Sequence, residues 1–208
     1  MIRLTVVLSI LMGLGGCSQT ASVSSTAAIG PGSSKAPSGT QMVMRGYAFP
    51  PPAFRPFCAR EPQLCSTVGS TKTVKLTPER MAELKAVTVS VNRRIREQSD
   101  LASTGKADDW RLPATVGDCE DFAILKKKEL MERGWPASAL LLTVATRGGE
   151  GHVVLTVRTD RGDFVLDNMT NAVRDWSKAP YRYFARQSQS ASGKWERIGT
   201  ASQPATTG

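Results

Sequence analysis

The sequence predicts an α+β fold in which a cysteine at the N-terminus of a helix packs against an antiparallel sheet that carries a histidine and an aspartate. Gly117-Asp118-Cys119-Glu120-Asp121 stands directly before a stretch with helical periodicity. Two β-rich runs follow and are separated by a turn sequence, which predicts an antiparallel hairpin. The single histidine, His152, lies near the start of the first run, and Asp167 ends the second.

The composition suits one globular domain with tails. The chain has 208 residues, of which 40% are hydrophobic and 22% charged, and it shows no repeat of solenoid length. The formal net charge of +9 favours acidic partners or an anionic membrane surface, although a solvated basic surface is the simpler interpretation. The basic residues are scattered and aromatic residues make up 6% of the chain, so no binding of nucleic acid is predicted.

The N-terminus has the features of an exported lipoprotein. Residues 1–16 combine Arg3 with an apolar run too short to span a bilayer, as in a signal peptide. The run ends in Leu14-Gly15-Gly16-Cys17, which resembles a bacterial lipobox with Cys17 as the lipidated residue. The alternative is an ordinary cleaved signal peptide, and both interpretations export the protein. Ser18, in place of Asp, favours an outer-membrane anchor facing the periplasm.

The remaining boundaries follow from composition. Residues 17–41 are rich in Ser, Ala, Gly and Pro and are expected to form a flexible tether. The folded domain is expected to span residues 42–199. Residues 200–208 are expected to be a disordered tail.

Prolines are frequent at the beginning of the folded domain. Residues 45–65 carry prolines interspersed with aromatic residues and are predicted to be extended chain, not helix. Cys58 and Cys65 are seven residues apart, which in an exported protein predicts a disulfide that stabilises by about 2–3 kcal/mol. A metal site is the alternative, but the single histidine and the lack of a second cysteine pair argue against zinc.

Thr77-Pro78-Glu79 predicts the start of a helix that runs to about Gln98, with Thr77 as its N-cap. Asn92 lies beside the apolar stripe of this helix and is predicted to be solvated, with a buried contact near the active site as the alternative. Residues 99–115 are predicted to form a polar connection. Trp110 within it is expected to anchor the core, with a pocket wall as the alternative.

A second helix is predicted from Asp118 or Cys119 to Arg133, ended by Gly134. Lys126-Lys127-Lys128 is predicted to form its solvent-facing side, opposite an apolar side that includes Phe122. Strands are predicted at residues 140–146, 152–158, 164–166 and 195–198, with residues 159–162 as the hairpin turn.

Cys119 is the candidate nucleophile. The thiolate is the reactive form of cysteine, and a helix N-terminus and a neighbouring imidazolium both favour it. His152 alone could supply the imidazole, and Asp167 could orient it, since a hairpin brings these ends together. A register slip of one residue would separate them. Taken singly, each residue has a structural alternative: a buried cysteine, a structural histidine or a turn-capping aspartate.

The order of cysteine, histidine and aspartate is that of papain-like and transglutaminase-like folds. The motifs resemble those of the bacterial transglutaminase-like cysteine proteinases over roughly residues 77–168. They are Asp109-Trp110-x-x-Pro113, Gly117-Asp118-Cys119-Glu120-Asp121-Phe122-Ala123 followed by Lys126 or Lys127, Leu130 and Gly134, then Gly151-His152-Val153-Val154-Leu155 and Val165-Leu166-Asp167-Asn168.

The resemblance implies a role for each candidate residue. Cys119 would be the nucleophile, His152 the general base and then acid, and Asp167 the orienting group. The implied reaction is hydrolysis of a peptide bond through a thioester acyl-enzyme. Backbone N–H groups at the helix start, including that of Cys119, would form the oxyanion hole.

The resemblance also implies a calcium site. In adhesin-cleaving members of the family, the acids that flank the cysteine contribute to it, and Asp118 and Glu120 occupy those places. Calcium takes about six to eight oxygen ligands, and Asp121, Asp108 and Asp109 are available as further ones. The alternative is that Asp118 caps the helix and both acids complement its dipole. No organic cofactor is predicted.

The predicted partner is a protein substrate of the cell envelope or surface. The lipobox, the proline-rich segment and the short chain differ from the adhesin-cleaving proteases, so an adhesin substrate is less strongly implied than the catalysis. Two alternatives are open. One is acyl transfer to an amine by the same residues, as in a transglutaminase or amidase. The other is a non-catalytic, lipid-tethered protein that binds a partner in a calcium-dependent way.

Overall fold

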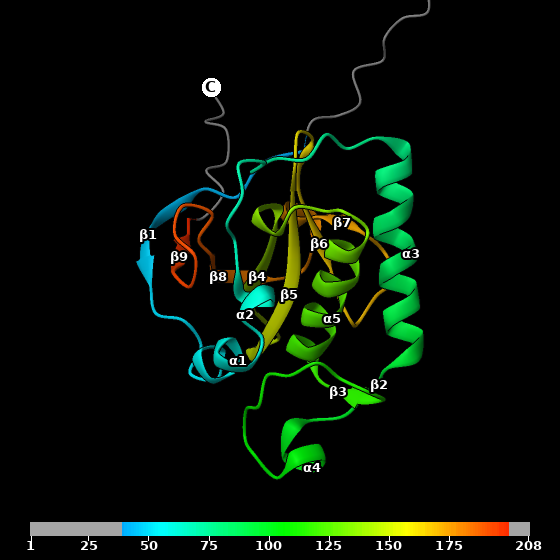
Figure 1. Cartoon of the computed structure of the whole chain (residues 1–208), viewed down its shortest axis with the longest axis vertical. Coiled ribbons are helices and arrows are strands. Elements are labelled where there is room, and N and C mark those ends of the chain that lie inside the picture. Colours follow the sequence, from blue (N-terminus) through cyan, green and yellow to red (C-terminus); the bar gives the residue numbers. More distant parts are fainter. Residues whose placement is uncertain (1–38, 200–208) are drawn as a thin grey trace, which may run out of the picture. The chain divides into compact units, whose positions relative to one another are not determined.

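A seven-stranded sheet forms the centre of the computed structural model, which describes residues 39–199 (Figure 1). Its strand order is β1-β9-β8-β4-β5-β6-β7, and all neighbouring strands in it are antiparallel. Helix α5 (Cys119–Glu132) lies against β5 and β4, and α3 (Pro78–Arg94) packs on α5. This arrangement is the predicted α+β class.

The bounds of the other elements locate the predicted strands. The sheet consists of β1 (Met44–Ala48), β4 (Leu140–Arg147), β5 (Glu150–Thr159), β6 (Gly162–Leu166), β7 (Arg174–Asp175), β8 (Arg182–Gln187) and β9 (Trp195–Ile198). The remaining elements are α1 (Phe54–Arg60), α2 (Pro62–Cys65), β2 (Arg96–Glu97), α4 (Asp100–Thr104), β3 (Val116–Gly117), and the 3₁₀ turns η1 (Ala137–Ala139) and η2 (Trp176–Lys178). All four predicted strands are present, whereas β1, β7 and β8 of this sheet and the β2–β3 pair were not predicted.

The larger hydrophobic core lies between one face of the sheet and the helices. Trp110 is buried in it and packs edge-on against Phe54 and Trp195, with ring centroids 5.8 and 6.4 Å away. Trp110 therefore anchors the core, as predicted. A smaller cluster on the opposite face comprises Met42, Val154, Val165 and Trp176.

Helix α5 differs from the prediction in where its lysines lie. Lys126 and Lys127 are fully buried, and Lys128 alone of the three is partly exposed. Lys127 donates hydrogen bonds to Ser66 O and to Gln187 Oε1, at 3.3 and 3.1 Å. The prediction that all three face water is wrong because α5 packs against α2 and α3 as well as the sheet.

Residues 45–65 contain two short helices as well as extended chain, so the prediction that this segment is not helical is wrong. The prolines fit because Pro56 and Pro62 lie in the first turns of α1 and α2, where backbone N–H groups have no partner within the helix. The sulfur atoms of Cys58 and Cys65 are bonded, which joins the two helices.

Helix α3 ends at Arg94 and does not reach Gln98. The chain after it forms a parallel pair of strands in which Arg96 lies opposite Val116 and Glu97 opposite Gly117. The predicted polar connection, residues 99–115, contains α4. The β2–β3 pair holds the end of α3 beside the residues that lead into α5.

The folded domain begins before Met42. Thr40 O accepts hydrogen bonds from Trp176 Nε1 and from Asp163 N, at 2.8 and 3.1 Å. Gln41 also donates to Thr159 O, so the last residues assigned to the tether belong to the domain. The predicted signal peptide, Cys17 and the C-terminal tail lie outside the described residues. Within residues 39–199, no helix has the length and apolar character needed to cross a membrane.

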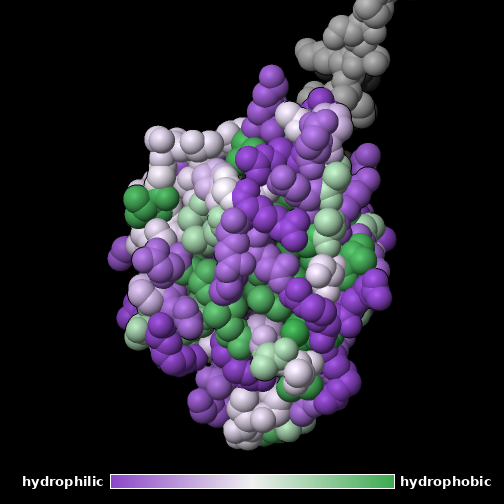
Figure 2. Space-filling view, turned by 45° about the vertical axis from the view of Figure 1, so that its right-hand side comes forward, coloured by the Kyte–Doolittle hydropathy of each residue, from purple (hydrophilic) through white to green (hydrophobic). Residues whose placement is uncertain are grey.

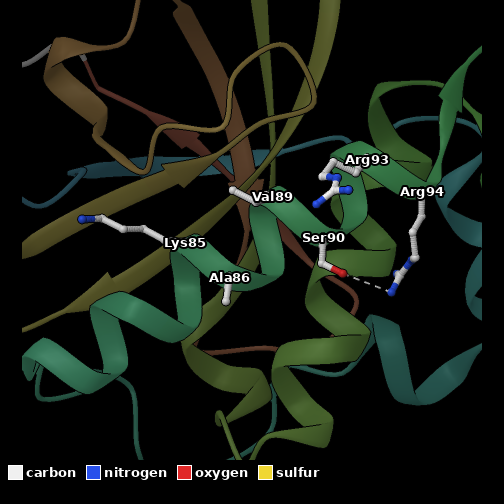
Figure 3. A pocket seen from close by; sticks show the side chains of 6 residues that line it. All are labelled: Lys85, Ala86, Val89, Ser90, Arg93 and Arg94. Atoms are coloured by element: carbon white, nitrogen blue, oxygen red, sulfur yellow. Dashed lines mark hydrogen bonds between the residues drawn. The ribbon is translucent and has the colours of Figure 1, made fainter.

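The outer face of α3 is basic. Lys85, Arg93 and Arg94 line a shallow hollow of about 570 Å³ there (Figure 3). Arg94 donates to the Ser90 hydroxyl and pairs with Glu129 of α5. Hydrophilic residues cover most of the face that Figure 2 shows, around a smaller hydrophobic area. None of the predicted catalytic residues lines this hollow, which fits the interpretation of a solvated basic surface.

Candidate active site

Cys119 is the first residue of α5. The chain enters the helix through Gly117, which must be glycine because a Cβ there would lie 2.7 Å from the Asp121 side chain and 3.1 Å from Pro113 Cβ. The backbone N–H groups of a first helical turn have no partner within the helix. They are therefore available to stabilise an oxyanion beside Cys119.

His152 and Asp167 meet at the predicted hairpin. Leu155 lies opposite Leu166 in the β5–β6 pair, so the start of β5 is beside the chain that follows β6. His152 Nε2 is 2.9 Å from Asp167 Oδ1, and both side chains are buried. The register slip that would separate them does not occur. With Nε2 on the aspartate, Nδ1 is the ring nitrogen left for proton transfer.

Cys119 and His152 line the same open cleft of about 280 Å³. Cys119 Sγ has no hydrogen bond to the His152 ring; it lies 3.2 Å from Glu120 Oε2 and 3.4 Å from Val153 N. Proton transfer from thiol to imidazole therefore requires Sγ to turn toward Nδ1, as catalytic groups often do only when substrate binds. The other lining residues are Glu97, Asp118, Arg147, Glu150, Gly151 and Met169.

The surroundings of Cys119 favour the thiol over the thiolate. Burial raises the pKa of Cys119, and the Glu120 carboxyl adds to this effect. The result is opposite to the one predicted from the helix N-terminus alone. The pKa of Glu120 is itself raised to about 9 by burial and by Asp118. Negative charge at this helix start is thus unfavourable without a cation nearby.

Two residues hold Asp167 in place. The Tyr181 hydroxyl donates to Asp167 Oδ2, and the Tyr181 and His152 ring centroids are 5.2 Å apart. Asn92 Nδ2 donates to Asp167 O at 3.0 Å and to Thr170 O at 3.1 Å. Asn92 was predicted to be solvated, and this prediction is wrong. The alternative, a contact near the active site, is the one that the structure has. Burial alone would raise the pKa of Asp167, but hydrogen bonds from His152 and Tyr181 lower it.

Asp100, Asp118 and Glu120 form an acidic cluster beside Cys119, with one carboxylate oxygen from each within 4.8 Å of the others. Asp118 stands at the N-cap position of α5, but its side chain does not cap the helix. Its Oδ2 accepts from Asp100 N at 3.0 Å, and its Oδ1 is buried without a hydrogen-bond partner among the described residues. Three acids with an unpartnered buried oxygen fit a hard cation such as Ca²⁺.

The sequence did not reveal Asp100 as a member of this cluster, because it lies at the start of α4, in a connection with no predicted structure. The ligands proposed in its place lie elsewhere. Asp121 accepts a hydrogen bond from Arg111 N at 2.9 Å, and neither Asp108 nor Asp109 joins the cluster. Arg111 pairs with Asp100 at 2.8 Å, which offsets part of the cluster's negative charge.

A cysteine at a helix N-terminus, above an antiparallel sheet that presents a paired histidine and aspartate, defines a transglutaminase-like cysteine peptidase. The family model for the bacterial transglutaminase-like cysteine proteinases (BTLCP) matches residues 44–203, and the chain belongs to this family. The predicted family, fold class and enzyme class are confirmed.

Three similar solved structures are of LapG from Legionella pneumophila. The calcium-bound form is 23% identical, with a TM-score of 0.49, and the match covers 76% of this chain and 88% of LapG. A second LapG structure is 25% identical, with a TM-score of 0.48 and coverages of 71% and 81%. The EGTA-treated form is 24% identical, with a TM-score of 0.48 and coverages of 74% and 84%. No curated protein matches the chain.

Proposed function

We propose that the protein cleaves peptide bonds of an envelope or surface protein, with Cys119, His152 and Asp167 as its catalytic residues. The observation that carries the proposal is the 2.9 Å contact between His152 Nε2 and Asp167 Oδ1, with His152 in the same cleft as Cys119. The family supplies the reaction class. The geometry supports Cys119 as the nucleophile, His152 as the general base and then acid, and Asp167 as the residue that orients His152.

The reaction proceeds in two halves. His152 Nδ1 takes the thiol proton as Cys119 Sγ attacks the scissile carbonyl carbon, and N–H groups at the start of α5 stabilise the oxyanion. His152 then protonates the leaving amine as the C–N bond breaks, which leaves a thioester. Water attacks the thioester through His152, and Sγ leaves with the proton while the new carboxyl end is released. Asp167 holds Nε2–H and stabilises the imidazolium.

Replacement of the nucleophile tests this proposal. Cys119→Ala should abolish cleavage of envelope proteins and labelling by a thiol-directed acylating probe. Mass spectrometry of proteins shed by cells that carry the wild type or Cys119→Ala identifies the substrate. Cleavage by Cys119→Ala, or products that form only as amides of an added primary amine, would show that the assignment is wrong.

We also propose that Asp100, Asp118 and Glu120 hold a calcium ion. The support is the mutual approach of their oxygens within 4.8 Å and the unpartnered, buried Asp118 Oδ1. Backbone carbonyls and water must supply the rest of about six to eight ligands. A bound calcium ion would supply positive charge. That charge would offset the negative charge of the carboxylates beside Cys119 and stabilise the first turn of α5.

Calcium titration into metal-free Cys119→Ala protein tests the site independently of activity. We expect one calorimetric binding event per chain and a higher Tm with calcium, because the ion binds the folded state. Glu120→Gln should weaken binding by about tenfold or more. Asp108→Asn, an acid outside the cluster, should not. Equal calcium affinity of Glu120→Gln and the wild type would contradict the proposed ligand set.

We further propose that the protein is a periplasmic lipoprotein, anchored to the outer membrane through Cys17. The support is the sequence of residues 1–18, with its apolar run, its lipobox-like end and Ser18 after the cysteine. Cells fed a palmitate analogue should label the wild type and not Cys17→Ser. Label that persists in Cys17→Ser would refute the anchor.

A further inference from the structure

An apolar groove shares strand β4 with the catalytic cleft, because Val144 lines the groove and Arg147 lines the cleft. It has a volume of about 650 Å³ and is lined by residues 47–52, by Val144 of β4, and by Phe184 and Ala185 of β8. Arg197 of β9 is the one charged residue of its lining. The groove is thus an apolar surface with a single cation at its border.

Three exposed aromatic side chains line the groove. Phe49 is 83% exposed, Tyr47 52% and Phe184 48%. No other aromatic side chain within residues 39–199 is exposed to this degree. Tyr47 and Phe49 also pack edge-on, with ring centroids 5.2 Å apart. Exposed apolar surface gathered in one place marks an interaction site more often than scattered single residues do.

A β-bulge directs Phe184 into the groove. Val144 lies opposite Ala185 and Ala145 opposite Tyr183, so Phe184 is an extra residue in β8 with no partner across β4. Neighbouring residues in a regular strand point to opposite faces of the sheet. Phe184 and Ala185 nevertheless both line the groove, as a bulge that re-aims a side chain allows. The bulge therefore adds the aromatic ring of Phe184 to the groove.

The bulge lies at the level of the catalytic residues. Val144 is opposite Val153 of β5, and Val153 N is 3.4 Å from Cys119 Sγ. Ala145, the next residue of β4, is opposite His152. Paired residues in an antiparallel sheet lie about 4.5–5.5 Å apart. An extended chain advances about 3.3 Å per residue, so a substrate that crosses β4 from Cys119 reaches the groove within about four residues.

We propose that this groove binds an apolar or aromatic side chain of the polypeptide substrate, within about four residues of the scissile bond, and so selects the site of cleavage. The inference rests on the proposed peptidase function. A polypeptide is the occupant because Val144 of the groove is paired with Val153, whose backbone N–H lies beside Cys119 Sγ. A single border cation, Arg197, does not match a phosphate-rich partner such as an anionic membrane.

Cleavage of a proteome-derived peptide mixture tests the inference. The wild-type chain should cut at sites enriched in large apolar or aromatic residues at one fixed position near the cut, as read by mass spectrometry. Phe184→Asp should lose this enrichment and lower kcat/KM for a wild-type substrate peptide by about tenfold or more, whereas Phe184→Leu should keep both. Val68→Asp makes the same change of charge at a residue that is 73% exposed outside the groove, and it should cut like the wild type.

Circular dichroism and alkylation of Cys119 by iodoacetamide establish that each variant is folded with an accessible thiol. If Phe184→Asp does not fold, Phe49→Asp takes its place, because Phe49 is the most exposed aromatic residue of the groove.

Four results would overturn the inference. Wild-type cuts without apolar enrichment, or with the same enrichment in Phe184→Asp, would exclude the groove from selection and leave the peptidase proposal intact. The lack of any cut that depends on Cys119 would overturn both proposals. A wild-type dimer that Phe184→Asp converts to a monomer with an unchanged cleavage pattern would assign the groove to contact between two copies of the chain.

Discussion

At the scale of single residues, the orientation of His152 depends on Asp167, which is itself fixed by several hydrogen bonds. His152 and Tyr181 each use one of its carboxylate oxygens, and Asn92 holds its backbone carbonyl. A carboxylate bound on both oxygens cannot rotate away from the imidazole that it orients. In the proposed mechanism, Tyr181 would therefore position His152 through Asp167 without touching the substrate.

Tyr181→Phe should lower stability in a pH-dependent way. The lost hydrogen bond helps to hold the pKa of Asp167 below its usual range. A lowered carboxyl pKa contributes stability above the unfolded value of about 3.9, and this contribution is lost as pH falls through the folded-state value. We expect a loss of about 1 kcal/mol at pH 7 and a smaller loss at pH 3, measured by urea denaturation.

The neighbouring tyrosine provides the control. Tyr183 donates its hydroxyl hydrogen to Trp176 O and makes no hydrogen bond to Asp167. Tyr183→Phe should therefore cost a similar amount at both pH values. If the two variants show the same dependence on pH, the Tyr181 hydroxyl does not stabilise the charged form of Asp167.

At the scale of elements, α5 carries Cys119, the proposed nucleophile, at its start and two buried lysines further along. Lys126 Nζ has no hydrogen-bond partner among the described residues and lies 5.3 Å from the centroid of the Phe122 ring. Burial lowers the pKa of Lys126 from 10.5 to about 7, against an opposing effect of Asp167. Below pH 7 the folded protein thus carries a buried charge, and stability rises as pH increases from 7 to 10.5.

Lys126→Met should therefore stabilise the protein at neutral pH, by about 1–4 kcal/mol. The gain should be full at pH 7 and below and should decline toward pH 10.5, as thermal or urea denaturation across this range would measure. Lys127→Met is the matched comparison, because it also removes the hydrogen bonds to Ser66 O and Gln187 Oε1 and should gain less. A gain for Lys126→Met that is the same at every pH would contradict this account.

The same helix shows what the sequence could predict. Apolar spacing and Gly134 are local signals, and they placed the limits of α5 within one residue of those observed. The burial of Lys126 and Lys127 depends on packing against α2, α3 and the sheet, which local spacing does not report. Strand β8 was missed for a similar reason. Its Arg186 is buried and pairs with Asp163, a partner 23 residues away that local spacing does not reveal.

The site was predictable to the same extent. Cys119, His152 and Asp167 could be proposed because the chain offers one histidine and one hairpin to bring the latter two together. Asp100 and Tyr181 could not, because they reach the site through α4 and through the chain that precedes β8, and neither element has a strong local signal. Residues that reach the site only through the tertiary fold are not found from sequence spacing, whereas the candidate catalytic residues were.

At the scale of the whole molecule, Asp163 connects distant parts of the domain. Its buried carboxylate accepts hydrogen bonds from Arg158 of β5 at 2.9 Å, from Arg186 of β8 at 2.8 Å and from Met42 N at 2.8 Å. The chain before β1, the central hairpin and β8 thus converge on one carboxylate. This cluster lies at the turn of the hairpin, away from the end that carries His152.

Asp163→Asn should destabilise the fold by about 3–5 kcal/mol, because it leaves buried guanidinium groups without a counter-charge. Burial lowers the pKa of Arg186 only to about 10, so this side chain is still charged at pH 7.

Asp160→Asn, in the adjacent turn, is the control. Asp160 is exposed and accepts one hydrogen bond, from Leu76 N, so the loss of stability should be about 1 kcal/mol or less. Urea denaturation measures both, and kcat/KM per folded molecule should be unchanged, since the cluster is remote from the cleft. If Asp163→Asn costs no more than Asp160→Asn, the apolar core alone holds these strands together.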